Sequence, residues 1–189
     1  MSNTSILRKK WTPYAVALVG AGVVVLLAWM SRGRLNPVIA GQPVPEFSAL
    51  DVQGVSRSAD DYRGKVVLLN IWATWCETCK EEMPSMQRLY EMMEGEEFEI
   101  LAVSIDAPIG QRDLFGMSGG DLWAYADSLS LTFPILHSPS GRIAEAFRIT
   151  GVPESFVIDG DGVIIRKVSG PTAWDAPGYI ELVERLLGR

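Results

Sequence analysis

The sequence predicts an α/β fold: a central mixed β-sheet flanked by helices, with an N-terminal hairpin extension and one N-terminal transmembrane helix. Two observations indicate the sheet. Apolar runs alternate with amphipathic helical patterns along most of the chain. The last elements before the carboxyl terminus are a predicted hairpin and one helix. An uncharged run near the amino terminus indicates the membrane helix. With 189 residues, 48% of them apolar, the chain can bury one good core besides that run.

The uncharged run covers residues 11–30 and has basic residues on both sides. A helix of this length spans about 30 Å, the thickness of the hydrocarbon core of a bilayer. Three basic residues and the amino terminus precede the run and two basic residues follow it, so the positive-inside rule places the amino terminus in the cytoplasm. A signal peptide cleaved after 38–40 is the alternative, although its apolar core is usually only about 7 to 15 residues long.

The predicted organisation therefore has four parts. The chain is anchored in the cytoplasmic membrane by a single pass, and its folded domain lies on the periplasmic or extracytoplasmic side. The parts are a cytoplasmic tail (1–10), a transmembrane anchor (11–30), a linker (31–41) and a folded domain (42–189).

Charge divides along the same boundary. Five of the 17 basic residues and none of the 23 acidic ones lie before position 41, so the folded domain is strongly acidic. Such a domain repels phosphate backbones, and we expect no nucleic acid among its partners.

The folded domain begins with a predicted short hairpin, which turns at Gln53 and Gly54. A polar connection then ends at Gly64. The next segment, VVLLNIW at 66–72, is an almost continuous apolar run rich in β-branched residues. Such a run is typical of a strand that is covered on both faces.

A helix is predicted directly after this strand, in the segment CETCKEEMPSMQRLYEMME. Pro84 lies inside it and predicts a kink, because proline lacks an N–H and clashes with the preceding turn. Apolar residues recur at close to the helical period of 3.6. They are Met83, Met86, Leu89, Tyr90 and Met93.

The rest of the chain alternates in the same way. Phe98–Asp106 predicts a second buried strand, 107–120 a glycine-rich loop, and 121–131 a helix capped by Asp121. After these we expect a short strand FPILH, a helix SGRIAEAFRI, two strands turned through DGDG, and a final helix from about Pro177.

Three uses are open to the two cysteines of the chain, Cys76 and Cys79. A structural crosslink between residues three apart closes a small loop and removes little entropy from the unfolded chain. A zinc site needs four ligands, and the chain adds one histidine, His137. Redox chemistry suits the pair best, because Cys76 begins a helix, where unpaired N–H groups stabilise a thiolate. We expect Cys76 to attack and Cys79, one turn on, to resolve the mixed disulfide.

Two motifs, VVLLNIWATWCETCKEEMPSM and TGVPESFVIDGDGVI, make the chain resemble a known family. Over roughly 41–189 it is similar to the TlpA/ResA/CcmG-like membrane-anchored thiol-disulfide oxidoreductases of the thioredoxin superfamily. The resemblance implies a thioredoxin-like fold in which Cys76 is the attacking and Cys79 the resolving cysteine. We expect no cofactor and no bound metal.

The same resemblance assigns four further positions. Trp75 matches the tryptophan that borders the active site, and Pro84 matches the proline that kinks the helix. Pro153 matches the proline that is cis in this fold and faces the disulfide. Val152 would then offer its backbone to an incoming extended peptide.

One departure from ordinary thioredoxin concerns proton transfer. Asn70 stands where thioredoxin has a buried aspartate, and an amide cannot accept the proton of the resolving thiol. Glu82 matches an acidic residue typical of the family and lies one turn after Cys79, so we assign it the proton-handling role. The alternative is that Glu81 and Glu82 are merely exposed helix charges.

The residues around the cysteines also bear on reactivity. Glu77 and Thr78, between the cysteines, are candidates for substrate contact, and a carboxylate beside Cys76 disfavours its thiolate. The pair is therefore predicted to be reducing rather than strongly oxidising. Trp72 and Phe156 can be read either as part of an apolar rim around the disulfide or as core residues, with core favoured for Trp72.

The predicted activity is that of an extracytoplasmic protein-disulfide reductase. The resemblance suggests two kinds of target, apocytochrome c and the proteins of oxidase copper-site assembly, and a membrane thiol-electron transporter as reductant. Two rivals remain. A peroxiredoxin-like peroxidase would need a Thr-x-x-Cys arrangement, whereas Thr74 lies only two positions before Cys76. A copper-binding chaperone would use both thiols and His137.

Overall fold

The computed structural model describes residues 14, 16–27, 38–113 and 115–189. The chain divides into two units, 1–37 and 38–189. In the first unit, residues 16–27 form a helix with exposed side chains. Within the described ranges, no helix is both long enough and apolar enough to cross a membrane. The predicted tail at 1–10, residues 11–13, 15 and 28–30 of the predicted anchor, and residues 31–37 of the predicted linker lie outside these ranges.

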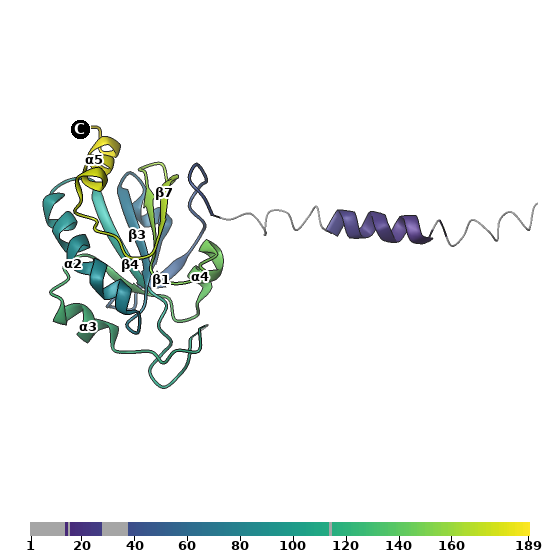
Figure 1. Ribbon diagram of the computed structural model, residues 1–189, viewed down its shortest axis with the longest axis horizontal. Coiled ribbons are helices and arrows are strands. Elements are labelled where there is room, and N and C mark those ends of the chain that lie inside the picture. The colour runs from purple at the N-terminus through teal and green to yellow at the C-terminus, as the bar shows by residue number, and fades with distance from the viewer. Residues whose placement is uncertain (1–13, 15, 28–37, 114) are drawn as a thin grey trace, which may run out of the picture. The chain divides into compact units, whose positions relative to one another are not determined.

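A seven-stranded sheet forms the centre of the second unit (Figure 1). β3, β4 and β5 are parallel, β6 and β7 extend the sheet antiparallel beyond β3, and the β1–β2 hairpin extends it beyond β5. The sheet is therefore mixed, as predicted. Its strands are β1 (Ser48–Leu50), β2 (Ser56–Ser58), β3 (Val66–Trp72), β4 (Phe98–Ser104), β5 (Ile135–His137), β6 (Glu154–Ile158) and β7 (Ile164–Ser169).

Helices cover both faces of this sheet (Figure 1). Asn70 of β3 and Ser155 of β6 point toward α2, where the Asn70 amide reaches Glu82. Phe156 points to the opposite face, because side chains alternate along a strand, and its ring contacts Phe147 of α4 at 4.9 Å. The helical elements are η1 (Ala59–Tyr62), α2 (Glu77–Met92), α3 (Leu122–Ser128), α4 (Arg142–Phe147) and α5 (Pro177–Leu186).

Within the second unit, the predicted strands and helices are confirmed with small differences at their ends. All seven residues of β3 are buried, as a strand covered on both faces requires. Asp121 caps α3 through its side chain, and α5 begins at Pro177. β4 ends at Ser104, two residues before the predicted end at Asp106. The reason is that Asp106 turns out of the strand, where its carboxylate accepts hydrogen bonds from the backbone N–H and the hydroxyl of Thr74, just after β3.

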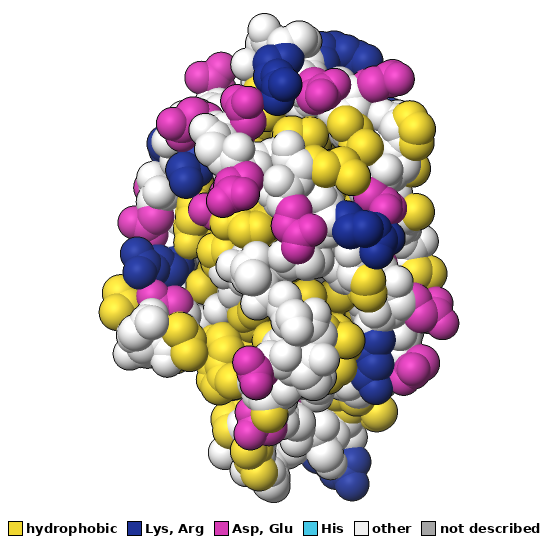
Figure 2. Space-filling model, turned by 90° about the vertical axis from the view of Figure 1, so that its left-hand side faces the viewer, with side chains coloured by type: hydrophobic (Ala, Val, Ile, Leu, Met, Phe, Trp, Pro, Cys, Tyr) yellow, Lys and Arg dark blue, Asp and Glu magenta, His cyan; other side chains and the backbone are white. Residues whose placement is uncertain are grey.

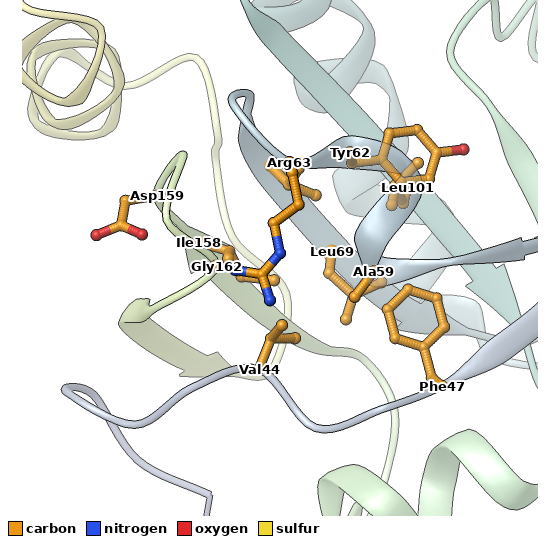
Figure 3. A pocket seen from close by; sticks show the side chains of 11 residues that line it. Val44, Phe47, Ala59, Tyr62, Arg63, Leu69, Leu101, Ile158, Asp159 and Gly162 are labelled. Atoms are coloured by element: carbon orange, nitrogen blue, oxygen red, sulfur yellow. The ribbon is translucent and has the colours of Figure 1, made fainter.

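The hairpin extension is held by its turn and by packing on the sheet. The Asp51 carboxylate accepts hydrogen bonds from the backbone N–H groups of Gln53 and Val55 at 3.0 and 2.8 Å. Gly54 adopts a positive φ of 77° there, which favours glycine. A small pocket lies where the segment around the hairpin meets β3 and β6, and Val44, Leu69 and Ile158 line it (Figure 3). None of the predicted site residues lines this pocket.

Candidate active site

A disulfide joins Cys76 and Cys79 just after β3, at the start of α2. Their Cα atoms lie 5.3 Å apart. Cys76 is the N-cap of α2, and its sulfur accepts a hydrogen bond from the Cys79 backbone N–H at 3.1 Å. Cys76 is 5% exposed and Cys79 is fully buried. A partner therefore reaches Cys76 first, and the N–H that binds its sulfur in the disulfide is placed to stabilise a Cys76 thiolate.

Glu82 lies one turn beyond Cys79 and is 2% exposed. One of its carboxylate oxygens accepts a hydrogen bond from the Asn70 amide at 2.7 Å. The other accepts from the Thr172 backbone N–H at 3.1 Å and from the Trp174 indole N–H at 3.4 Å. Glu81 is exposed. The alternative of two exposed helix charges is therefore wrong for Glu82.

Burial raises the pKa of the Glu82 carboxyl from its usual 4.5 to about 7, although the hydrogen bonds from Asn70, Trp174 and Thr172 favour the carboxylate. A carboxyl with a pKa near neutrality can both take up and release a proton in this range. Asn70 is fully buried, and its amide also donates to the Ser155 hydroxyl at 2.9 Å. Asn70 thus orients the Glu82 carboxylate without itself accepting a proton.

The Val152–Pro153 peptide bond is cis, which confirms that implication of the resemblance. β6 begins at the next residue, Glu154, which pairs with Ile71 near the end of β3. Pro153 therefore lies at the same end of the sheet as the turn that carries Cys76. Val152 is half-buried beside it. The predicted contact of the Val152 backbone with a bound peptide stays a prediction.

The three remaining predicted contact residues differ in their surroundings. Trp75 is half-buried, whereas Glu77 and Thr78 are exposed. The Thr78 hydroxyl lies 3.5 Å from the Cys76 sulfur. The Glu77 carboxylate forms an ion pair with Lys80 at 3.0 Å. Because a cation accompanies that carboxylate, the effect of Glu77 on the Cys76 thiolate is smaller than the sequence alone indicates.

Asp106, which sequence analysis missed as a site residue, ties the active-site turn to its surroundings. It is fully buried. One oxygen accepts from the Thr74 N–H at 2.8 Å and the Ser104 hydroxyl at 2.7 Å. The other accepts from the Thr74 hydroxyl at 2.6 Å and the Gly120 N–H at 3.3 Å. A signal was present, because a carboxylate at the carboxyl end of a buried strand lies beside the turn after the neighbouring parallel strand.

Replacing Asp106 with alanine should lower the free energy of unfolding by about 2 kcal/mol or more, because buried donors on Thr74, Ser104 and Gly120 lose their acceptor. Urea unfolding of the oxidised chain measures this loss. Asp127→Ala is the matched control, since Asp127 is exposed on α3, and it should stay within about 0.5 kcal/mol of the parent. Equal stabilities of the two variants would contradict the assignment.

The β4–α3 loop, residues 107–113 and 115–120, lies against the turn that carries Cys76. The Trp75 indole N–H donates to the Asp113 carboxylate at 2.7 Å, and the Trp75 and Phe115 rings meet edge to face at 5.9 Å. The loop returns through two glycines. A Cβ on Gly119 would collide with the Ala107 carbonyl, and one on Gly120 with the Thr74 hydroxyl. The glycines thus permit the close approach of the loop to this turn.

Several candidate side chains are part of the packed structure and do not lie at the disulfide. Trp72 is fully buried, as favoured, and Phe156 is also fully buried against Phe147. The reading of Phe156 as a rim residue is therefore wrong, because its side chain projects to the α4 face. A ring nitrogen of His137, Nε2, lies 2.8 Å from the Asp106 carbonyl oxygen. Among the residues that the structure describes, no three His, Cys, Asp or Glu side chains are grouped as metal ligands.

This combination of a mixed sheet, a Cys-x-x-Cys disulfide at a helix N-cap and a neighbouring cis-proline defines a thioredoxin-fold dithiol protein. Solved structures agree. A thiol:disulfide interchange protein of the thioredoxin family from Chlorobium tepidum has a TM-score of 0.60 and 26% identity, covering 78% of this chain and 97% of that one. StoA from Bacillus subtilis, at 22% identity, shares the fold with a TM-score of 0.57, covering 77% of this chain and 98% of that one.

Sequence comparison narrows the class. Residues 40–167 match the AhpC/TSA family. The thiol-disulfide oxidoreductase ResA of Geobacillus kaustophilus is 32% identical over 148 residues, which cover 78% of this chain and 79% of that protein. The thioredoxin-like protein YneN of Bacillus subtilis is 36% identical over 158 residues, 82% of this chain and 87% of that protein. The chain belongs to the AhpC/TSA family and, within the thioredoxin superfamily, to the TlpA/ResA-like thiol-disulfide oxidoreductases.

Proposed function

We propose that this chain reduces disulfides of partner proteins outside the cytoplasmic membrane, to which the segment 11–30 anchors it. The observation that carries the proposal is the disulfide at the N-cap of α2 with the buried Glu82 carboxyl one turn away. It supplies one sulfur that is more exposed than the other, a fully buried second sulfur, and a group that exchanges protons near neutrality.

The reaction starts from the reduced pair. The Cys76 thiolate attacks one sulfur of the partner disulfide, that S–S bond breaks, and the other partner sulfur leaves and takes a proton. Glu82 accepts the proton of the Cys79 thiol. The Cys79 thiolate then attacks the Cys76 sulfur, which releases the second partner thiol and forms the Cys76–Cys79 disulfide. Two electrons thus pass to the partner. The first partner sulfur released takes its proton from water, and the second takes the proton that Glu82 accepted from Cys79.

The next cycle needs two electrons, which we assign to a membrane thiol-electron transporter because an oxidising compartment keeps no pool of reductant. Apocytochrome c and the proteins of oxidase copper-site assembly are the two candidate partners. Both need reduced cysteines before they can bind haem or copper, so a dithiol reductase suits either.

The reduction potential tests the direction of electron flow. We expect a value closer to about −270 mV, typical of thioredoxin, than to about −120 mV, typical of strong oxidants of this fold. Equilibration of the full chain with glutathione buffers, followed by alkylation of free thiols, measures it. A potential near the oxidising value would overturn the assignment as a reductase.

Thiol labelling tests on which side of the membrane the folded domain lies. The sequence contains two cysteines, Cys76 and Cys79, and both belong to that domain. After mild reduction of spheroplasts, a membrane-impermeant maleimide should label the full chain, and labelling should not increase when the membrane is opened. Cys76→Ser/Cys79→Ser is the control for background. Labelling that requires an opened membrane would place the domain in the cytoplasm and contradict the proposal.

A further inference from the structure

The β4–α3 loop exposes large apolar side chains beside the disulfide turn. Ile109 is 77% exposed, and Phe115 and Met117 are 40% exposed each. The loop forms the lower end of the folded unit in Figure 1. Figure 2, turned about the vertical axis, shows some hydrophobic side chains at that lower end, among charged and other polar ones. Exposed apolar side chains that gather in one place commonly mark a contact surface.

Hydrogen bonds within the loop hold these side chains in place. One Asp113 oxygen accepts from the backbone N–H groups of Phe115 and Met117 at 2.8 and 2.9 Å. The other accepts from the Trp75 indole. The Arg112 guanidinium donates to the Gly116 carbonyl at 2.5 Å. Both charged side chains of the turn thus make hydrogen bonds within the loop or with Trp75, which fixes the positions of the exposed apolar side chains.

The loop also lies next to the reacting cysteine. Phe115 packs on Trp75, and Trp75 directly precedes Cys76. Attack on a disulfide requires the partner's sulfur to contact the Cys76 sulfur. The chain that carries that sulfur must therefore pass over this turn, within reach of the loop. A lipid or a molecule without a disulfide has no such reason to lie there.

We propose that the β4–α3 loop is the docking surface for the partner polypeptide, and that Ile109, Phe115 and Met117 bind apolar side chains next to its target cysteine. The inference rests on the proposed function and specifies its substrate class, an extended segment in which apolar residues flank the reducible cysteine. The bond chemistry is that of the proposed reaction, with the Cys76 sulfur replacing one partner sulfur.

Two synthetic peptides test the proposal. Each carries one cysteine in a mixed disulfide with glutathione, flanked by leucines in one and by serines in the other. The reduced full chain is mixed with each peptide, and the second-order rate constant of a single turnover is measured. We expect a preference of about tenfold for the leucine-flanked peptide, since burying a few apolar groups yields a discrimination of this size.

The preference should disappear in Ile109→Ser/Met117→Ser, which removes apolar surface but leaves the contact between Phe115 and Trp75 in place. Met92→Ser is the matched control. Met92 is 55% exposed and ends α2, a helix of 16 residues, so it lies about 24 Å along the helix from Cys76. This control should keep the tenfold preference.

The outcomes distinguish a failure of the docking surface from a failure of the proposed function. Equal rates for both peptides in the parent, or an undiminished preference in the loop variant, would overturn the docking surface. Reduction of neither peptide would instead overturn the proposed function. If the loop joined two copies of the chain or rested on lipid, the variant would change the oligomeric state or the binding to phosphatidylglycerol vesicles while keeping the peptide preference, which also contradicts the proposal.

Discussion

Replacing Cys79 with serine should stop the reaction at the mixed disulfide, so that the full chain accumulates covalently bound to its partner through Cys76. Serine is close to cysteine in size and fits the fully buried position, but its hydroxyl cannot attack the Cys76 sulfur. Turnover should fall on the order of 10³-fold or more. Gel analysis without reductant, followed by identification of the adducts, measures both the trapping and the nature of the partner.

Cys76→Ser is the matched control for this experiment. It removes the more accessible sulfur, so both turnover and adducts should be lost. Adducts formed by the Cys76→Ser chain would mean that Cys79 attacks, against its complete burial. The same variants examine the peroxidase alternative, because sustained consumption of peroxide by Cys79→Ser would contradict a reaction that needs both sulfurs. The Thr74 hydroxyl is already engaged by Asp106, which does not favour that alternative.

Replacing Glu82 with glutamine should slow resolution of the mixed disulfide about 100-fold, the lower end of what a positioned proton acceptor contributes. In the parent chain the resolution rate should rise as Glu82 ionises with a pKa of about 7. In the variant this rise should be absent, leaving only the titration of the thiols. Stopped-flow measurement between pH 5 and 9 records the profile. Glu81→Gln, at the exposed neighbouring position, should behave like the parent.

The same carboxyl predicts a dependence of stability on pH. Because burial raises the Glu82 pKa in the folded chain, the folded state binds the proton more tightly than the unfolded state. The stabilisation is complete below the usual pKa of 4.5 and is lost as the pH rises through about 7, at about 1.4 kcal/mol per unit. The parent should therefore lose about 3 kcal/mol across this window relative to Glu82→Gln. Urea unfolding at several pH values measures this difference. If the free energy of unfolding changed equally with pH in both chains, the assignment would be contradicted.

The local sequence pattern was enough to predict the β-strand before the cysteines and the redox role of the cysteine pair. The run Val66–Trp72 is apolar except at Asn70 and coincides with β3 residue for residue. The position of Cys76 after a strand and before a helical period indicated the start of a helix, and the structure places Cys76 there as the N-cap of α2. The cis bond at Pro153 was implied by family resemblance, since composition and spacing around a proline leave its isomer open.

Side chains that act across elements were harder to predict. Glu81 and Glu82 are equivalent in local pattern, and only the packing of α2 on β3, together with Thr172 and Trp174, buries one of them. Phe156 could face either side of the sheet until the register of β6 was known. A shift of one residue would exchange the two faces.

By itself, the sequence determined the order of strands and helices, the redox pair and the class of reaction, because hydrophobic period, capping residues and cysteine spacing act over a few neighbouring positions. The tertiary structure decided that Glu82 is sheltered, that Asp106 binds the active-site turn, and that the β4–α3 loop lies on Trp75. Each of these depends on groups from separate segments that meet in the folded chain, and the two carboxylates meet their partners away from water. There, burial shifts the pKa of a carboxyl and a hydrogen bond is costly to lose.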